Sequence, residues 1–157
     1  MRLTDLLSLE RVAIERVQAA SEFTKASALK VLSAMLALGA KADAAEVERI
    51  LHEREQLQST GIGDGVAIPH GALAQLENQC AALLIVPGGL DFAAIDGGLV
   101  NIVFAVIGPK RATGEHLKTL ARVSRLLRNK GFRDRLVAAE SPKEAYDLIA
   151  SEEGERR

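Results

Sequence analysis

The sequence predicts an α/β domain whose helices gather toward both ends of the chain and whose strands occupy the middle. Residues 81–86 form a continuous apolar run, and residues 100–107 are apolar except for Asn101; both have the length expected for buried strands. No helical pattern separates the two runs, so we expect them to pair antiparallel. Apolar residues at helical spacing occur before and after this region. A chain of 157 residues is long enough for one domain with a sizeable core.

The first segment of the chain predicts a strand and a helix. Residues 3–9 suggest a short helical turn, and the apolar residues between Val12 and Val17 suggest a first strand. A helical pattern begins at Ser21 and stops at Gly39, a residue type that commonly ends helices. We therefore expect Gly39 to be the C-cap of this helix.

A second helix is predicted to begin at Asp43. Glu46 follows three residues later, which makes a variant of the capping box. The predicted buried face consists of Val47, Ile50 and Leu51. This helix carries Arg54 directly into the most unusual stretch of the chain.

A third helical region begins at Thr113, the predicted N-cap, and places His116 in its first turn. The free amides at such a helix end stabilise an anion and disfavour a protonated imidazole. The predicted apolar positions are Leu117, Leu120, Ala121, Ser124 and Leu127. A capping box over residues 141–144 opens a last helix, and we expect the charged tail 151–157 to fray.

Composition and charge exclude several classes of function. Acidic and basic residues nearly balance to a net charge of −1, so no global field attracts nucleic acid. No apolar run is long enough to span a bilayer, and acidic residues come too early for a signal peptide. Cys80, the only cysteine, excludes an internal disulfide and fits a reducing compartment. We therefore expect a cytoplasmic protein without membrane insertion.

Basic residues recur at helical spacing in the third helical region. They are Lys118, Arg122, Arg125 and Arg128. Two interpretations stay open for them: a solvated outer face, which is the commoner role of such a row, and a docking patch for an acidic partner.

The chain concentrates its unusual chemistry in residues 59–71. Three glycines alternate there and permit positive φ and unobstructed amides, an arrangement that suits an anion-binding concavity. They are Gly61, Gly63 and Gly65. The apolar run 66–68 predicts a buried strand that ends at His70, and Pro69 stiffens the backbone before this histidine. Exchange of a phosphoryl group is one interpretation, and a glycine-rich turn with a histidine that only hydrogen bonds is the other.

Other known site patterns do not fit this stretch. The glycine spacing lacks the final glycine of a dinucleotide-binding loop, and no Gly-Lys-Ser/Thr follows as in a P-loop. Ser59 lacks the G-x-S-x-G elbow of a serine nucleophile. The histidines and the cysteine show none of the close pairings of zinc sites, so we predict no metal site and no cofactor.

The chain resembles a known family along nearly its whole length. Residues 54–71 are similar to the phosphorylation-site signature of the mannitol/fructose-type enzyme IIA domains of the bacterial phosphoenolpyruvate-dependent phosphotransferase system. The matching residues are Arg54-Glu55, Ser59-Thr60-Gly61-Ile62-Gly63 and Ala67-Ile68-Pro69-His70-Gly71. Further matches in register are Asp91-Phe92, Ile95-Asp96-Gly97, Glu115-His116-Leu117 and Phe132-Arg133. Without a fused IIB or IIC partner, the chain most resembles the nitrogen-regulatory branch, although residues 74–79 are more polar than the family pattern.

The resemblance implies a mixed five-stranded sheet flanked by helices on both faces. It implies that residues 1–150 form the enzyme IIA domain and residues 151–157 a flexible tail. His70 is then the residue that accepts a phosphoryl group, on Nε2, from a phosphohistidine of an HPr-like carrier, with Arg54 beside it and His116 facing it. The expected phosphate-binding positions are Ser59, Thr60, Gly61 and Gly63.

Three functions stay open. The resemblance favours a phosphocarrier, rather than a turnover enzyme on a small molecule. Such a carrier would regulate nitrogen, carbon or potassium metabolism by binding target proteins in a way that depends on its phosphorylation state. Potassium transporters and sensor kinases are the expected targets. The first alternative is a sugar-transport enzyme IIA that passes phosphate to a IIB component. The second is a binding module that has lost phosphotransfer, which the intact histidine, arginine and hydroxyl positions disfavour.

Overall fold

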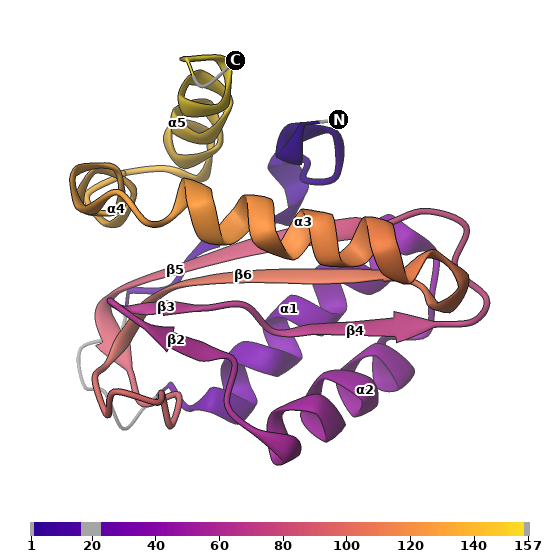
Figure 1. The fold of residues 1–157 in the computed structure, drawn as a ribbon. Coiled ribbons are helices and arrows are strands. Elements are labelled where there is room, and N and C mark those ends of the chain that lie inside the picture. The colour runs from indigo at the N-terminus through magenta and orange to yellow at the C-terminus, as the bar shows by residue number, and fades with distance from the viewer. Residues whose placement is uncertain (1, 17–22, 156–157) are drawn as a thin grey trace.

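A six-stranded mixed sheet lies between two layers of helices in the computed structural model, which describes residues 2–16 and 23–155 (Figure 1). The helices on one face are α1 (Lys25–Ala40) and α2 (Ala44–Leu57). Those on the other face are α3 (Thr113–Leu126), α4 (Lys130–Val137) and α5 (Pro142–Glu155). The predicted α/β class with helices on both faces is confirmed, whereas the expected count of five strands is one too low.

The sheet is built around an antiparallel pair, as predicted for the two long apolar runs. The strands are β1 (Val12–Ile14), β2 (Gly61–Gly63), β3 (Val66–Ala67), β4 (His70–Leu73), β5 (Cys80–Leu90) and β6 (Val100–Pro109). Strand β1 runs parallel to β5, β3 and β4 run parallel to β6, and β2 pairs antiparallel with β3. Strand β5 continues past the predicted end at residue 86, with an irregular register after Ile85.

Alternation along β5 and β6 divides the core into two layers. Leu84 and Val103 face the cluster formed with α1 and α2. Leu83 and Phe104, their neighbours in sequence, face the cluster formed with α3, α4 and α5. Both sides of these strands are therefore buried, which is why their sequences are almost continuously apolar instead of alternating.

Pro69 interrupts what would otherwise be one strand. Val66 pairs with Ile102 and His70 pairs with Val106, so β3 and β4 keep a single register against β6. Proline has no amide hydrogen to donate to the ladder, but its carbonyl still accepts a hydrogen bond from Val106 N at 3.0 Å. The prediction that a strand ends at His70 is wrong, because this residue begins β4.

The ends of the first two helices agree in part with the predictions. The C-cap of α1 is Lys41, whose φ of 56° lies in the left-handed region, and not Gly39, which is still helical. Asp43 is the N-cap of α2, as predicted, and its carboxylate accepts a hydrogen bond from Ala45 N at 2.9 Å. The predicted start of the first helix at Ser21 and the predicted end of the first strand at Val17 lie outside the described residues.

Helix α3 presents a different face to the core from the predicted one. Its N-cap is Ala112, at the end of the 3₁₀ turn η4 (Lys110–Ala112), and not Thr113. Its buried residues are His116, Thr119, Val123 and Leu126. Leu117, predicted to be buried, is 60% exposed. The four basic residues of this region are exposed, as both of their open interpretations require.

The two ends of the described chain contact each other. The N-terminal segment forms two 3₁₀ turns, η1 (Leu3–Asp5) and η2 (Leu9–Arg11). The Glu153 carboxylate on α5 accepts hydrogen bonds from Leu3 N at 2.7 Å and Thr4 N at 3.1 Å. Helix α5 extends to Glu155, through residues 151–155 that were expected to fray, and residues 156 and 157 of the expected tail lie outside the described residues. None of the helices in the described part of the chain is both long and apolar enough to cross a bilayer.

Candidate functional site

His70 lies at the start of β4, and a backbone carbonyl holds one of its two ring nitrogens. Its Nδ1 is 2.8 Å from the carbonyl oxygen of Ile68. A carbonyl oxygen only accepts hydrogen bonds, so Nδ1 carries the proton of the neutral ring and Nε2 carries the lone pair. Burial lowers the pKa of His70; the hydrogen bond to Ile68 and the charge of Glu55 oppose this effect, and the charge of Arg54 adds to it. The ring is therefore neutral and nucleophilic at neutral pH.

His116 approaches His70 from α3. The centroids of the two rings are 5.8 Å apart, and the ring planes are tilted by 52°. Burial lowers the pKa of His116, and the positive charge that His70 carries when protonated lowers it further. Gly108 in β6 makes this packing possible, because a Cβ at that position would lie 3.1 Å from His116 Nδ1. The structure thus brings together two histidines that are 46 residues apart in the sequence.

Arg54 is in the last turn of α2, with its Nη1 donating to Gln58 O at 2.8 Å. Burial is the main cause of the lowered pKa of His70, and the charge of Arg54 adds to it. Arg54 also lines a groove of about 560 Å³ between α2 and β4, together with Gly71, the neighbour of His70, and the cations Arg49 and Lys110. Glu46 and Glu53 also line this groove and both pair with Arg49, so its charged side chains leave a net charge of +1.

Ser59 and Thr60 direct their hydroxyl groups into the protein. Ser59 Oγ donates to Phe92 O at 3.0 Å and accepts from Gly61 N at 3.0 Å. Thr60 Oγ1 donates to the carboxylate of Glu55. Their arrangement shapes the loop that leads into β2, and direct contact of these groups with a phosphate stays a prediction.

Two of the glycines in this loop have the backbone conformation expected from the sequence. Gly63 and Gly65 have φ of 98° and 78°, which residues with a side chain rarely adopt. Gly61 is required for a different reason, since a Cβ there would lie 2.8 Å from Ala94 Cβ. Among the described residues, no three histidine, cysteine or acidic side chains cluster closely enough to hold a metal ion.

Comparison with known proteins identifies the family. Residues 10–152 match the model of the family described as phosphoenolpyruvate-dependent sugar phosphotransferase system, EIIA 2. The chain belongs to this EIIA 2 family.

Similar proteins include nitrogen regulatory proteins and a fructose-specific EIIA component. A nitrogen regulatory protein of Bradyrhizobium diazoefficiens is 35% identical over 150 residues, which cover 96% of this chain and 95% of the relative. A fructose-specific EIIA component of Haloferax volcanii is 29% identical over 155 residues, covering 96% and 97%. The crystal structure of the nitrogen regulatory protein IIA-Ntr from Neisseria meningitidis superposes with a TM-score of 0.84 at 28% identity and covers 94% of this chain and 98% of that one.

This EIIA 2 domain contains a buried ionic network that the sequence reasoning missed. The Glu55 side chain is 4% exposed and binds Lys25 Nζ at 2.9 Å. The same carboxylate accepts hydrogen bonds from the backbone N and the hydroxyl of Thr60. Lys25 also lies over the ring of Phe92, 4.7 Å from its centroid. One sequence signal was present, because Glu55 follows Leu51 by four residues and so falls on the buried face of α2.

Proposed function

We propose that this EIIA 2 domain is a cytoplasmic phosphocarrier that accepts a phosphoryl group on His70 Nε2 from a phosphohistidine of an HPr-like carrier protein. The observation that supports this most directly is the hydrogen bond between His70 Nδ1 and Ile68 O, 2.8 Å long. It favours the tautomer in which Nε2 holds a lone pair, and Pro69 and the pairing with Val106 constrain the backbone that carries the ring.

The transfer is a displacement between two nitrogens. The lone pair of His70 Nε2 forms the new N–P bond as the N–P bond of the donor histidine breaks, and the bonding pair returns to the donor imidazole. The transition state of such a reaction is loose, so the protein contributes mainly position and stabilisation of the three equatorial oxygens. A neutral acceptor is essential, because a protonated ring has no lone pair to attack with.

His116 and Arg54 are proposed to stabilise the transferring group. A ring whose centroid is 5.8 Å from that of His70 is close enough for its Nε2–H to donate to a phosphoryl oxygen on His70. Arg54, after release from Gln58 O, supplies a guanidinium whose planar donors suit phosphate oxygens. We propose that the adjoining loop makes the remaining phosphate contacts. The residues that shape this loop and make these contacts are Ser59, Thr60, Gly61 and Gly63.

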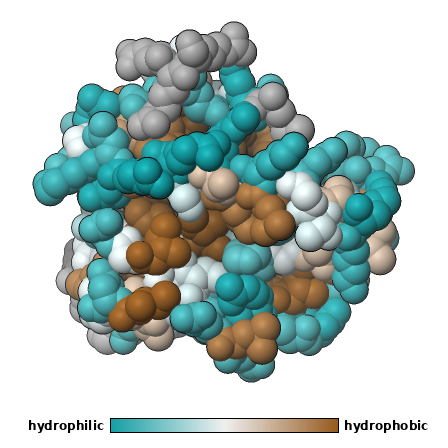
Figure 2. All heavy atoms as spheres, viewed as in Figure 1, coloured by the Kyte–Doolittle hydropathy of each residue, from teal (hydrophilic) through white to brown (hydrophobic). Residues whose placement is uncertain are grey.

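The docking surface for the carrier is proposed to surround this site. Figure 2 shows apolar side chains gathered in the middle of the face that carries α3 and β2, with hydrophilic side chains around them. Large exposed apolar residues on elements near the site are Leu57, Ile62 and Leu117. An apolar centre with a charged rim is the usual anatomy of a protein interface.

Regulation of target proteins by phosphorylation-dependent binding is the function we favour. The support is the similarity to nitrogen regulatory proteins over 96% of the chain. We assign the targets to nitrogen, carbon or potassium metabolism, with potassium transporters and sensor kinases as the partner classes. The similarity to a fructose-specific EIIA component favours a second candidate, transfer of the phosphoryl group to a IIB component.

Intact mass measured after incubation with phosphoenolpyruvate, enzyme I and an HPr-like carrier tests the proposal. We expect an acid-labile gain of one phosphoryl group that His70→Ala abolishes and His116→Ala slows. His52→Ala is the matched control, because His52 is on the exposed side of α2 and pairs with Glu48. A gain that survives in the His70 variant contradicts the assignment. Loss of the phosphoryl group on addition of a IIB protein indicates transport, and its persistence indicates regulation.

A further inference from the structure

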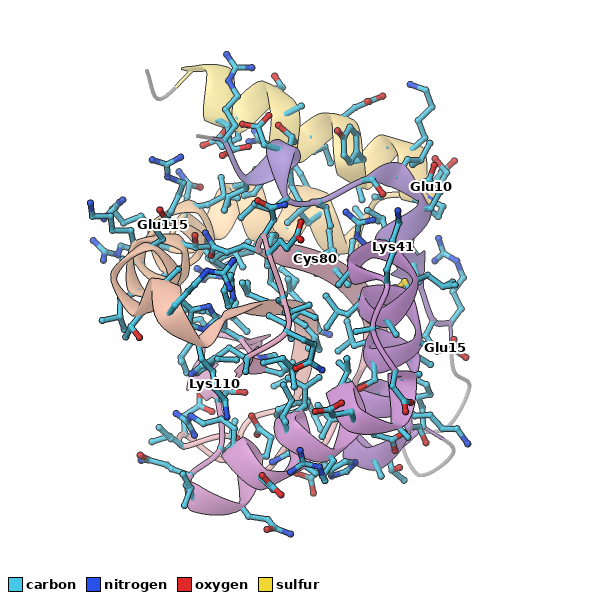
Figure 3. The ribbon with its side chains drawn as sticks, turned by 90° about the vertical axis from the view of Figure 1, so that its right-hand side faces the viewer. Glu10, Glu15, Lys41, Cys80, Lys110 and Glu115 are labelled. Carbon is cyan, nitrogen blue, oxygen red and sulfur yellow. The ribbon has the colours of Figure 1, made fainter. Side chains whose placement is uncertain are left out.

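A second hollow lies between the N-terminal 3₁₀ turn and α3, outside the proposed phosphotransfer site. Its volume is about 190 Å³. The N-terminal wall consists of Arg2, Leu3 and Leu6. The wall from α3 consists of Glu115, Lys118, Thr119 and Arg122, and Gln79 completes the lining. Figure 3 looks onto the end of the molecule where α3 begins and shows Glu115 there.

The walls of this hollow are held by hydrogen bonds. Leu6 O accepts from Ala81 N at 3.0 Å and from Arg11 Nη2 at 3.0 Å, which ties the N-terminal wall to β5. Leu3 N and Thr4 N donate to the Glu153 carboxylate on α5. The hollow is thus fixed by contacts with three elements of the fold. It does not depend on a loose loop.

The charges of the side chains that line the hollow do not cancel. Arg2, Lys118 and Arg122 are cationic and Glu115 is anionic, which leaves an excess of two positive charges. Within the described residues, none of these four side chains has an ion-pair partner within 4.0 Å. Glu115 offsets only one of the three cations, so the remaining positive charges repel one another and a bound dianion reduces that repulsion.

Two polar atoms of the lining are buried and unpaired. Within the described part of the chain, Arg2 Nε and Gln79 Oε1 have no hydrogen-bond partner. Buried polar atoms almost always have one, so a ligand that accepts from Arg2 and donates to Gln79 supplies what is missing. Leu3 and Leu6 add an apolar surface for a short carbon chain. The volume is below the range of drug-sized sites, so the ligand has few atoms.

We propose that this hollow binds a small organic dianion that carries a hydroxyl group, such as a hydroxydicarboxylate or a short phosphate monoester. Arg2, Lys118 and Arg122 bind its anionic groups, and Gln79 accepts its hydroxyl hydrogen. The inference is independent of phosphotransfer, because none of the residues assigned to that reaction lines the hollow.

His116 provides a built-in reporter of occupancy. It adjoins Glu115 in α3, and its Nδ1 and the Gln79 Cγ lie 3.1 Å and 3.2 Å from the same Cβ position at Gly108. The chain has three histidines, so their imidazole signals can be assigned in NMR spectra by single substitutions. A ligand in the hollow shifts the His116 signal and leaves that of His52, on the exposed side of α2, unchanged.

The experiment titrates the full chain with malate and with glycerol 3-phosphate at constant ionic strength, and with glycerol as the neutral control. We expect a saturable His116 shift with Kd of about 1 mM or tighter for at least one dianion. Saturation with malate indicates a carboxylate ligand, and saturation with glycerol 3-phosphate indicates a phosphate ligand. Shifts that glycerol or sodium chloride reproduces, or no saturation with either dianion, overturn the proposal.

Three variants locate the binding. Arg122→Gln is expected to weaken it about tenfold, since a charge-assisted hydrogen bond is lost. Glu115→Gln is expected to strengthen it, because the change removes the one negative charge of the lining. Arg125→Gln is the matched control: Arg125 is exposed on the same helix but does not line the hollow. Equal weakening by Arg122→Gln and Arg125→Gln, or weakening by Glu115→Gln, contradicts the assigned site.

Discussion

Removing Lys25 is expected to cost more stability than neutralising Glu55, although the two residues form one ion pair. The Lys25 side chain is 25% exposed, and that of Glu55 is 4% exposed. Lys25→Met keeps an apolar side chain at this position, but it removes the ammonium from the face of Phe92 and leaves a buried carboxylate without its cation. Glu55→Gln leaves a partly exposed ammonium that water can solvate, and its amide oxygen can still accept from Thr60.

The magnitudes follow from this asymmetry. Loss of one partner from a buried ion pair costs about 3–5 kcal/mol, and we place Lys25→Met at the lower end because Thr60 still donates twice to Glu55. We expect about 1–2 kcal/mol for Glu55→Gln, the value of one weakened charge-assisted hydrogen bond. The free energy of unfolding of the double variant should fall by less than the sum of the two single decreases, since no unpaired charge then stays buried.

Urea unfolding followed by circular dichroism measures these free energies. Lys130→Met is the control, because Lys130 and Asp134 form an exposed pair with side chains 79% and 65% exposed. That substitution should change the free energy of unfolding by less than about 1 kcal/mol. The reasoning is refuted if Lys25→Met costs no more than Lys130→Met, or if Glu55→Gln costs more than Lys25→Met.

Three further predictions use the same unfolding measurement. Gly61→Ala should destabilise by about 1–3 kcal/mol, because the added Cβ would lie 2.9 Å from the backbone Cα of Ala94, whereas Gly114→Ala, with open space around it in α3, should be neutral or stabilising. Asp43→Ala should cost about 1 kcal/mol through loss of the N-cap, and no loss would show that the cap contributes nothing. The pKa values of His70 and His116 are lowered from 6.5 in the folded protein, so the unfolded chain binds more protons as the pH falls below 6.5. The free energy of unfolding should therefore decrease below this pH. Replacing both histidines with asparagine should flatten this pH dependence.

Local signals predicted the parts of the fold that depend on neighbouring residues. The N-cap at Asp43 and the two long central strands follow from side chains within a few positions of one another. The face of α3 did not follow in this way, because residue type was taken as a guide to burial. Thr119 is buried without leaving its hydroxyl group unpaired, since its Oγ1 donates a hydrogen bond to Glu115 O at 3.1 Å. Leu117, an apolar residue of the same helix, is exposed.

The network around Glu55 shows where such signals end. The position of Glu55 on the buried face of α2 could be predicted from its spacing of four residues after Leu51. The identity of its partner was not, because Lys25 lies 30 residues away and reaches Glu55 only through the packing of α1 on α2. A buried carboxylate in a helical pattern therefore indicates that a cation is nearby without indicating which one.

The two histidines meet for different physical reasons. His70 is fixed locally, by Pro69 before it and by the hydrogen bond to Ile68 two residues back. His116 is fixed by topology: β4 and β6 run parallel with His70 opposite Val106, and β6 ends three residues later at Pro109. The short turn η4 then reverses the chain, so the first turns of α3 must pass back over the end of β6. Gly108 leaves room for the imidazole at that point, and the register of β4 on β6 therefore sets the distance between the two rings.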